Sequence, residues 1–373
     1  MSRNSGRPSG RDIYSSSRRY SSDRRRGGYN PNDIDRYNYV DRDIYSSSPR
    51  RRRPARKGGC LKRALTVLLV AVLLAAGAGL IYFHVLASRL NRSDNVTGQD
   101  LESYVQQPSD APAWDVKSDG GVMNILLLGV DENKDGTDGR SDTNILLSID
   151  RNSKDLHLVS FLRDTYLEIP TVGKSKLNTA FTKGGAALTM QTLENNYRVN
   201  IDKYVSVNFE NFAAVIDKMG GLDVKMSQSA CRQENKNMGS HLKPGVNHLN
   251  GRLCLYYARI RDASDDYGVN DFGRAGRQRQ VIELMIQKMK SLNPIESNKI
   301  LYDYLPYVKT NLNDGELLYL ASITASVSGY DVKSLQMPAD NAYKDEKKSV
   351  GEVLVPDLEK NCALLREFLY PNG

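Results

Sequence analysis

Cysteine, histidine and tryptophan are scarce in this sequence. Its 373 residues include four cysteines, four histidines and one tryptophan. The cysteines at positions 60, 231, 254 and 362 lack the paired spacing of zinc ligands, which excludes a zinc module built from them. No hydrophobic run precedes Cys60, so a lipoprotein attachment site is excluded as well.

Residues 64–86 lack Asp, Glu, Lys and Arg and are mainly apolar. At about 1.5 Å per residue, a helix of these 23 residues crosses a hydrocarbon layer of about 30 Å. Basic residues crowd its N-terminal flank, whereas only Arg89 and Arg92 lie close behind it. By the positive-inside rule, we predict a transmembrane helix over residues 64–87 with a cytoplasmic N-terminus. A cleaved signal peptide is the competing interpretation, but the run is too long and begins too late.

Residues 1–63 contain few acidic and few apolar side chains. Their 18 Lys and Arg against 6 Asp give a net charge of +12, which leaves about −4 for the rest of a chain whose total is +8. Such a segment cannot bury enough surface to offset chain entropy. We predict a disordered, basic cytoplasmic tail that contacts anionic lipid. A phosphorylated regulatory segment and a nucleic-acid-binding arm are the alternatives.

Residues 88–119 are polar and are predicted to form an extracytoplasmic linker, followed by one folded domain over residues 120–373. Short apolar segments bounded by polar turns are typical of strands covered on both faces of a sheet. Three such strands are predicted at residues 122–130, 143–149 and 156–162, and two more at 204–207 and 332–337.

Apolar residues at helical spacing alternate with these strands. One stripe consists of Ala186, Met190, Leu193 and Tyr197, and a second of Phe209, Phe212, Ala213 and Ile216. Further helices are expected at residues 251–258, 274–291 and 356–368. The order of elements predicts a three-layer α-β-α domain whose central sheet has mixed strand directions.

Charged residues stand at the ends of the predicted strands. Asp131 ends the first, Arg140 and Asp142 precede the second, and Arg163 follows the third. In open α/β sheets, ligands bind in the crevice beyond the carboxyl ends of the strands. Two carboxylates and two guanidiniums suit a diphosphate with its divalent metal, the carboxylates binding Mg²⁺ and the arginines binding phosphate oxygens. Surface ion pairs or loop caps are the simpler alternative.

A second group of arginines lies further along the chain, at Arg259, Arg261, Arg274 and Arg277. So much positive charge implies an anionic partner. A nucleic acid is disfavoured, because the domain is slightly acidic overall and is predicted to lie outside the membrane. We therefore expect an acidic ligand that is not a nucleic acid.

Seven segments resemble, in order, the successive motifs of the LytR-CpsA-Psr family. They are NILLLGVD (124–131), RSDT (140–143), SFLRDTY (160–166), KLNTAFTKGG (176–185), VNFENF (207–212), GVNHLNGRLCLYYARIR (245–261) and DFGRAGRQRQ (271–280). Any one of them is a weak signal, but seven in register over residues 120–290 form a specific one. The resemblance implies the fold of that family, with the catalytic domain outside the membrane of a Gram-positive type of cell.

The resemblance also implies an activity. Such enzymes move a glycopolymer from a polyprenyl diphosphate to peptidoglycan through a phosphodiester bond, with Mg²⁺ or Mn²⁺. By motif position, Asp131 and Asp142 would hold the metal, and Arg140, Arg163 and Asp271 would be catalytic. The diphosphate would be surrounded by Arg140, Arg163, Arg259, Arg261, Arg274, Arg277 and Gln278, a cluster that Asp271 would orient.

Three functional classes stay open. A glycopolymer transferase is favoured over a hydrolase that only cleaves polyprenyl diphosphates and over a non-catalytic regulator of the cell envelope. The transferred polymer could be teichoic acid, capsule or another glycan, and the general base is unassigned, with Asp271 the only suggestion.

Cys231 and Cys254 fall in the part predicted to lie outside the membrane, where disulfides form. They bracket the loop that leads into the helix at residues 251–258. A bridge between them would brace the scaffold of the arginine cluster, and two unpaired buried thiols are the alternative.

Overall fold

The computed structural model describes residues 58–92, 119–132, 138–327 and 329–371. Most of the predicted tail and most of the predicted linker lie outside the described residues.

The N-terminal helix α1 spans Gly58–Ala87. Within it, the 22 residues Thr66–Ala87 have a mean hydropathy of 2.4 and form the one candidate membrane span among the described residues. Its length is that of a single bilayer crossing. The span predicted at residues 64–87 agrees with it to within two residues.

A seven-stranded sheet forms the centre of the domain, in the order β1-β10-β7-β2-β3-β4-β11. β2 is antiparallel to β3 and parallel to β7, and β4 is antiparallel to β3 and parallel to β11. The predicted mixed sheet is therefore confirmed. The strand bounds are β1 Asn91–Arg92, β2 Val122–Glu132, β3 Asp138–Asp150, β4 Asp155–Phe161, β7 Lys203–Asn208, β10 Lys309–Thr310 and β11 Asp331–Met337.

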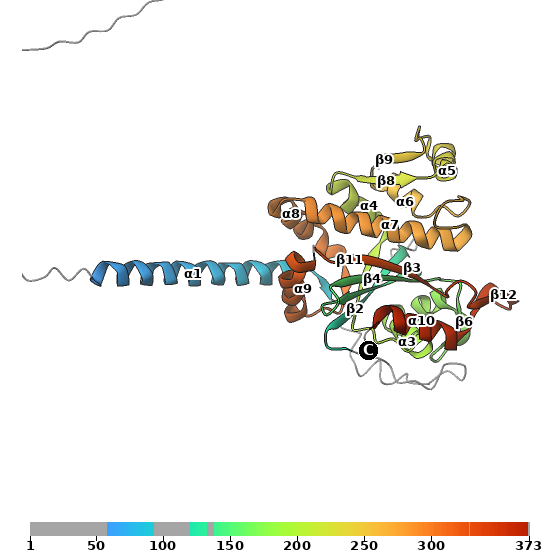
Figure 1. The fold of residues 1–373 in the computed structure, drawn as a ribbon, viewed down its shortest axis with the longest axis horizontal. Helices are drawn as coiled ribbons and strands as arrows, with labels where there is room; N and C mark the ends of the chain where they lie inside the picture. The colour runs from blue at the N-terminus through green and yellow to red at the C-terminus, as the bar shows by residue number, and fades with distance from the viewer. Residues whose placement is uncertain (1–57, 93–118, 133–137, 328, 372–373) are drawn as a thin grey trace, which may run out of the picture. The chain divides into compact units, whose positions relative to one another are not determined.

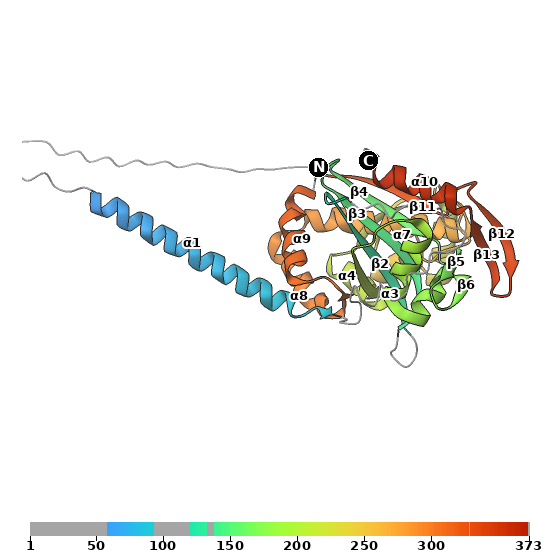
Figure 2. The same ribbon diagram turned by 90° about the horizontal axis from the view of Figure 1, so that it is seen from below.

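Helices cover both faces of this sheet (Figures 1 and 2). Successive side chains of a strand point to opposite faces, so Leu126 and Leu128 pack in one apolar cluster and Ile125 in another. α3 (Leu177–Tyr197) and α10 (Leu358–Leu369) lie on the first face. α4 (Phe209–Lys218), α6 (Gly251–Tyr257) and α7 (Asn270–Ser291) lie over the second. The three-layer architecture is as predicted.

α3 begins earlier than the sequence indicated and is interrupted at Gly184 and Gly185. Gly185 has a φ of +62°, in the left-handed region that glycine adopts at little cost. The predicted stripe after this break, from Ala186 to Tyr197, is buried against the sheet. The glycines thus mark a kink within the helix rather than its start.

Several short elements were not predicted. An antiparallel strand pair, β8 (Leu222–Met226) and β9 (Gly245–Leu249), packs with the intervening helix α5 (Gln228–Met238) against α4, α6 and α7. The others are hairpins and peripheral helices: β5 Tyr166–Ile169, β6 Gly173–Lys176, α8 Pro294–Tyr304, the 3-10 turn η1 Leu305–Tyr307, α9 Asp314–Val327, β12 Tyr343–Lys348 and β13 Gly351–Pro356.

The disulfide considered between Cys231 and Cys254 is not formed. Both are buried as free thiols in the apolar cluster that also contains side chains of β8 and β9. The Cys254 thiol instead donates a hydrogen bond to the Leu249 carbonyl, with a sulfur–oxygen distance of 3.7 Å. Apolar packing, not a covalent bridge, therefore braces this part of the domain, and the alternative of unpaired buried thiols is the one observed.

Candidate active site

Asp131 and Asp142 lie where the pairing of β2 with β3 is irregular. The register shifts on both sides of Val130, and the two aspartates are left out of the ladder there. Bulges of this kind bend a strand and re-aim its side chains, and they are common beside active sites. The Asp131 side chain is 65% exposed and that of Asp142 is partly exposed. Both carboxylates can therefore be reached by a ligand.

Arg259 follows α6 and extends toward the end of β2. Its Nη2 lies 3.7 Å from the Asp131 carboxylate. Its guanidinium lies 4.1 Å from the centroid of the Phe209 ring, at the start of α4. The aromatic face fixes the guanidinium plane without neutralising its charge. Since the side chain is nearly half exposed, that charge remains available to an anion.

Arg163 follows β4 and joins two acidic side chains. Its Nη1 donates to Asp142 at 2.8 Å and its Nε donates to Asp164 at 3.2 Å. Lys176 also donates to Asp164, at 2.8 Å. Burial alone would raise the pKa of Asp164, but Lys176 and Arg163 outweigh it and lower that pKa. Asp164 is thus a charged anchor that holds Arg163 in place, and it was not among the predicted site residues.

Asp271 occupies the first turn of α7 and pairs with two arginines. Its carboxylate lies 3.3 Å from Arg261 and 3.1 Å from Arg274. It is also hydrogen-bonded to Asp164, and burial together with that neighbouring carboxylate raises the pKa of Asp271. A carboxylate held by two arginines is placed to orient them, which is the role that the sequence suggested. The catalytic role that the resemblance implied for Asp271 stays a prediction.

Arg277 does not join this cluster, contrary to the prediction that it contacts the diphosphate. Its side chain is fully buried and donates to Asp265 at 2.7 Å. It also donates to the Ile260 carbonyl. A Cβ at Gly273 would lie 2.4 Å from the Gly268 carbonyl, so the helix and this loop touch backbone to backbone. Arg277 therefore holds the loop before α7 and cannot reach a ligand.

Arg140 and Gln278 lie on different elements, β3 and α7. Arg140 lies at the start of β3 with an exposed side chain. Gln278 lies one helical turn beyond Arg274 on α7 and lines a cavity together with Arg259 and Thr143. Of the residues that line this cavity, Arg259 and Gln278 were predicted as site residues.

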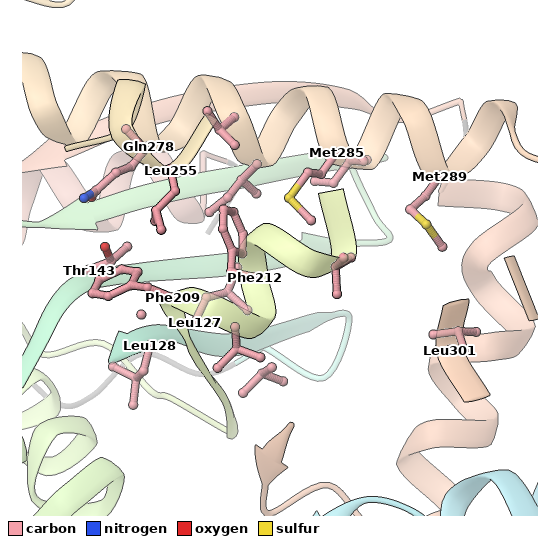
Figure 3. Close-up of a pocket in the computed structure, with 18 of the residues that line it drawn as sticks. Leu127, Leu128, Thr143, Phe209, Phe212, Leu255, Gln278, Met285, Met289 and Leu301 are labelled. Carbon is pink, nitrogen blue, oxygen red and sulfur yellow. The ribbon is translucent and has the colours of Figure 1, made fainter. Parts of the chain in front are cut away.

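The cavity has a volume of about 890 Å³ and lies between the sheet and the helices α4, α6, α7 and α8. Gln278 and Thr143 stand at one end, Phe212 and Met285 lie in between, and Met289 and Leu301 stand at the other end (Figure 3). The lining is almost entirely apolar. An elongated apolar group that ends in a charged one would fit this shape.

One face of α7 supplies much of the cavity wall. Gln278, Ile282, Met285 and Met289 recur at intervals of three and four residues and therefore share that face. The three apolar members are only partly buried, unlike the buried stripe of α3. Incomplete burial separates a cavity lining from a core, and a sequence does not contain that information.

A divalent metal would fit the end of the sheet. Among the described residues, no three His, Cys, Asp or Glu side chains form a metal-binding group. Two carboxylates, those of Asp131 and Asp142, would be enough for Mg²⁺. This ion usually binds one or two carboxylates and completes its coordination shell with water and substrate phosphates. Each carboxylate is now held by an arginine, Arg259 or Arg163, that could equally bind a phosphate oxygen.

Comparison with known proteins places this site in a family. The model of the LytR_cpsA_psr family matches residues 87–365. The chain belongs to this family. The resemblance drawn from the seven sequence motifs is confirmed.

The relatives include both a regulator and a transferase by name. Regulatory protein MsrR of Staphylococcus aureus (strain COL) is 32% identical over 257 residues, which cover 68% of this chain and 76% of MsrR. Polyisoprenyl-teichoic acid–peptidoglycan teichoic acid transferase TagU of Enterococcus faecalis is 31% identical over 283 residues, 75% of this chain and 87% of TagU. The solved structure "TagT bound to LIIa-WTA" is similar with a TM-score of 0.55 and 25% identity, over 71% of this chain and 96% of TagT.

Proposed function

We propose that this chain is a membrane-anchored phosphotransferase that moves a glycopolymer from a polyprenyl diphosphate to peptidoglycan through a phosphodiester bond. One observation carries the proposal: the exposed guanidinium of Arg259 and the amide of Gln278 stand at the end of an apolar cavity of about 890 Å³. A diphosphate esterified to a long hydrocarbon chain has the same two parts. Family membership and the transferase name of TagU support the same activity.

The cavity would hold part of the polyprenyl chain, and the arginines would hold the diphosphate. Arg259 and Arg163 reach the ends of β2 and β3 from two separate loops. Asp271 fixes Arg261 and Arg274 on a third side. Guanidiniums can bind two phosphate oxygens at once, so they fix orientation as well as charge. The headgroup would be held at the open end of the sheet, where an acceptor can approach.

The reaction exchanges one phosphorus–oxygen bond for another. The acceptor hydroxyl of peptidoglycan forms a bond to the phosphorus that carries the glycopolymer and releases its proton. The bond from that phosphorus to the bridging oxygen breaks, and polyprenyl monophosphate leaves with the bridging oxygen. Charge grows on the departing phosphate during this step, and fixed cations stabilise it. Arg163, Arg259 and Arg274 are placed to do so.

Asp131 and Asp142 are the residues that would hold Mg²⁺ or Mn²⁺. The ion would neutralise charge on the diphosphate oxygens. Without it, the same carboxylates keep Arg259 and Arg163 near the site. With the ion on the two carboxylates, Arg259 and Arg163 would be available to bind phosphate oxygens of the diphosphate. The paired arrangement therefore prepares the site for both ligands.

The orientation in the membrane is part of the proposal. The candidate span Thr66–Ala87 separates a strongly basic N-terminal segment from the folded domain. The positive-inside rule places the basic segment in the cytoplasm and the domain outside, where peptidoglycan is found. Protease added to intact cells should remove the domain and spare an N-terminal tag. Protection of the domain would contradict this orientation.

A turnover experiment with the full chain tests the reaction. With a lipid-linked glycopolymer, peptidoglycan fragments and Mg²⁺, we expect a phosphodiester-linked conjugate and an equal amount of polyprenyl monophosphate. Without the acceptor, release should fall sharply. Equal release without acceptor and no conjugate would identify a hydrolase, and no turnover under any condition would favour a non-catalytic regulator.

The metal assignment is tested in the same assay. Chelation should abolish turnover, and Mg²⁺ or Mn²⁺ should restore it. Asp131→Ala should remove the metal dependence together with the activity, whereas Asp331→Ala, an exposed residue at the opposite end of β11, should behave as the parent. Turnover that is unaffected by chelation and by Asp131→Ala would exclude this metal site.

A further inference from the structure

Large apolar side chains are exposed together on α8 and on the 3-10 turn that follows it. Ile295 is 82% exposed and Tyr307 54%, and Leu301 and Tyr302 are also exposed. Isolated apolar residues are common on soluble surfaces, but a group of them on one short segment marks a place of contact. Ile295 and Tyr302 are seven residues apart and share one face of the helix.

This segment is tied to the residues that follow the candidate membrane span. The Arg89 guanidinium lies 3.9 Å from the centroid of the Tyr302 ring. Arg89 is only two residues beyond Ala87, where the span ends. Two residues of chain extend at most about 7 Å. If the span crosses a bilayer, Tyr302 must lie close to the membrane–water interface.

Strand pairing also links the residues after the candidate membrane span to the segment that contains Tyr307. Arg92 in β1 pairs with Thr310 in β10, and β10 follows the 3-10 turn directly. Arg92 also forms an ion pair with Asp314 at the start of α9. The strand pairing and the ion pair therefore hold the residues that follow the candidate membrane span against the elements around Tyr307.

The same segment forms the far end of the apolar cavity. Leu301 lines the cavity and is exposed at the surface, so the cavity wall and the exposed face meet at this residue. Leu292 and Ser297 line the cavity nearby. Figure 3 shows Leu301 and Met289 at the end opposite Gln278 and Thr143.

We propose that the face formed by Ile295, Leu301, Tyr302 and Tyr307 rests in the leaflet next to the end of α1, and that the polyprenyl chain passes between the bilayer and the cavity beside Leu301. The second part rests on the proposed function. Tyrosine is enriched at membrane interfaces because its ring is apolar and its hydroxyl stays in water. The occupant of this face is thus lipid, and the substrate need not cross water to reach the site.

Quenching of tryptophan fluorescence by brominated lipid tests the membrane contact in the full chain. The chain has a single tryptophan, Trp114, which supplies a common baseline. Ile295→Trp is compared with Val246→Trp, because Val246 is 72% exposed on β9, away from α8 (Figure 1). In phosphatidylcholine vesicles brominated high on the acyl chains, only Ile295→Trp should be quenched beyond the parent.

Equal quenching of the two variants would overturn the proposal. The proposal would also be overturned if the fluorescence of Ile295→Trp were not quenched by brominated lipid but changed with protein concentration. A second copy of the chain would then cover the face. Both results are independent of catalysis. The quenching experiment therefore decides the membrane contact even if the proposed reaction is wrong.

A substitution at the same position tests lipid delivery. Ile295→Asp should lower turnover of a long-chain donor embedded in vesicles roughly tenfold, the effect expected from losing the burial of one isoleucine. Turnover of a short-chain, water-soluble donor should not change, and Val246→Asp should match the parent with both donors. Equal losses with both donors would contradict delivery from the bilayer, whereas a parent inactive with both would refute the proposed function instead.

Discussion

The two halves of α7 differ in chemistry although they belong to one helix. The N-terminal half carries Asp271 and Arg274, which pair with charged groups beside the strand ends. The C-terminal half carries Met285 and Met289, which line the apolar cavity. Gln278 lies between them and touches the cavity at its polar end (Figure 3).

This difference shows how one rigid element can bind two unlike parts of a ligand. A helix rises about 1.5 Å per residue, so the 11 residues from Gln278 to Met289 separate the polar from the apolar end by roughly 16 Å. Charge is concentrated at one end, and water can be excluded from the other. If the comparison is right, substitutions in the two halves should have separable effects.

The largest effect is expected from a residue of α7 that belongs neither to the charged set around Asp271 nor to the cavity lining. Arg277→Ala should lower the free energy of unfolding by about 3–5 kcal/mol, because it leaves the Asp265 carboxylate buried without its partner. Urea unfolding of the full chain in detergent measures this change. Arg252→Ala, at an exposed position on α6, is the matched control and should be neutral. A neutral Arg277→Ala would mean that the guanidinium is not structural.

A change in the charged set should affect turnover and spare stability. Arg259→Ala should lower turnover by about 10²–10³-fold, the usual cost of removing one group that stabilises transition-state charge. The unfolding curve should stay close to that of the parent, because Arg259 is exposed and its ion pair with Asp131 is weak. Arg252→Ala again serves as control. Full activity of Arg259→Ala would remove this arginine from the site.

The sequence was sufficient to predict five of the seven strands of the sheet and most of the charged residues at its edge. Each predicted strand was an apolar run whose burial on both faces leaves little choice of structure. The structure places Asp131, Asp142 and Arg163 beside the ends of these strands, as predicted, because the ends of such strands are easy to locate. On these residues alone, surface ion pairs were the simpler alternative, and the arginines at positions 259–277 together with the seven family motifs favoured a ligand site.

The sequence was insufficient where the same residue type serves two purposes. Arg274 and Arg277 stand three residues apart in one basic motif, and only the loop around Asp265 makes the second one structural. Met285 and Met289 could have been ordinary core, since apolar residues at helical spacing pack a core far more often than they line a cavity. Tertiary neighbours decide both cases, and spacing along one chain does not reveal them.

Filling the cavity should produce a smaller effect that depends on the donor. Ile286→Trp places a larger side chain in the cavity wall and should raise the KM for a long-chain donor roughly tenfold, through loss of buried apolar contact. A short-chain donor should be turned over as before. Gln287→Trp, exposed on the same helix and outside the lining, controls for the added bulk. Equal losses with both donors would mean that the cavity does not hold the chain.

Measured per pH unit, the smallest effect concerns a carboxyl group outside both halves. Asp271 has arginine partners, whereas Glu234 on α5 is fully buried and neither of its carboxyl oxygens has a hydrogen-bond partner among the described residues. Burial raises the pKa of Glu234 to about 8 from its ordinary value of 4.5. Glu234 is therefore protonated in the folded domain at neutral pH, and its ionisation opposes folding.

The sign of the pH effect follows from that raised pKa. The protonated form favours the folded state fully below pH 4.5, and this contribution is lost as the pH rises through about 8. The free energy of unfolding should therefore decline by at most about 1.4 kcal/mol per pH unit in this window because of Glu234. Glu234→Gln should remove that part of the decline, and Glu210→Gln, at an exposed position on α4, should leave it unchanged. Unfolding curves of the full chain at pH 5, 6, 7 and 8 measure the difference. Parallel pH profiles for Glu234→Gln and the parent would show that water or an ionic partner reaches this carboxyl group, and the contrast with Asp271 would then disappear.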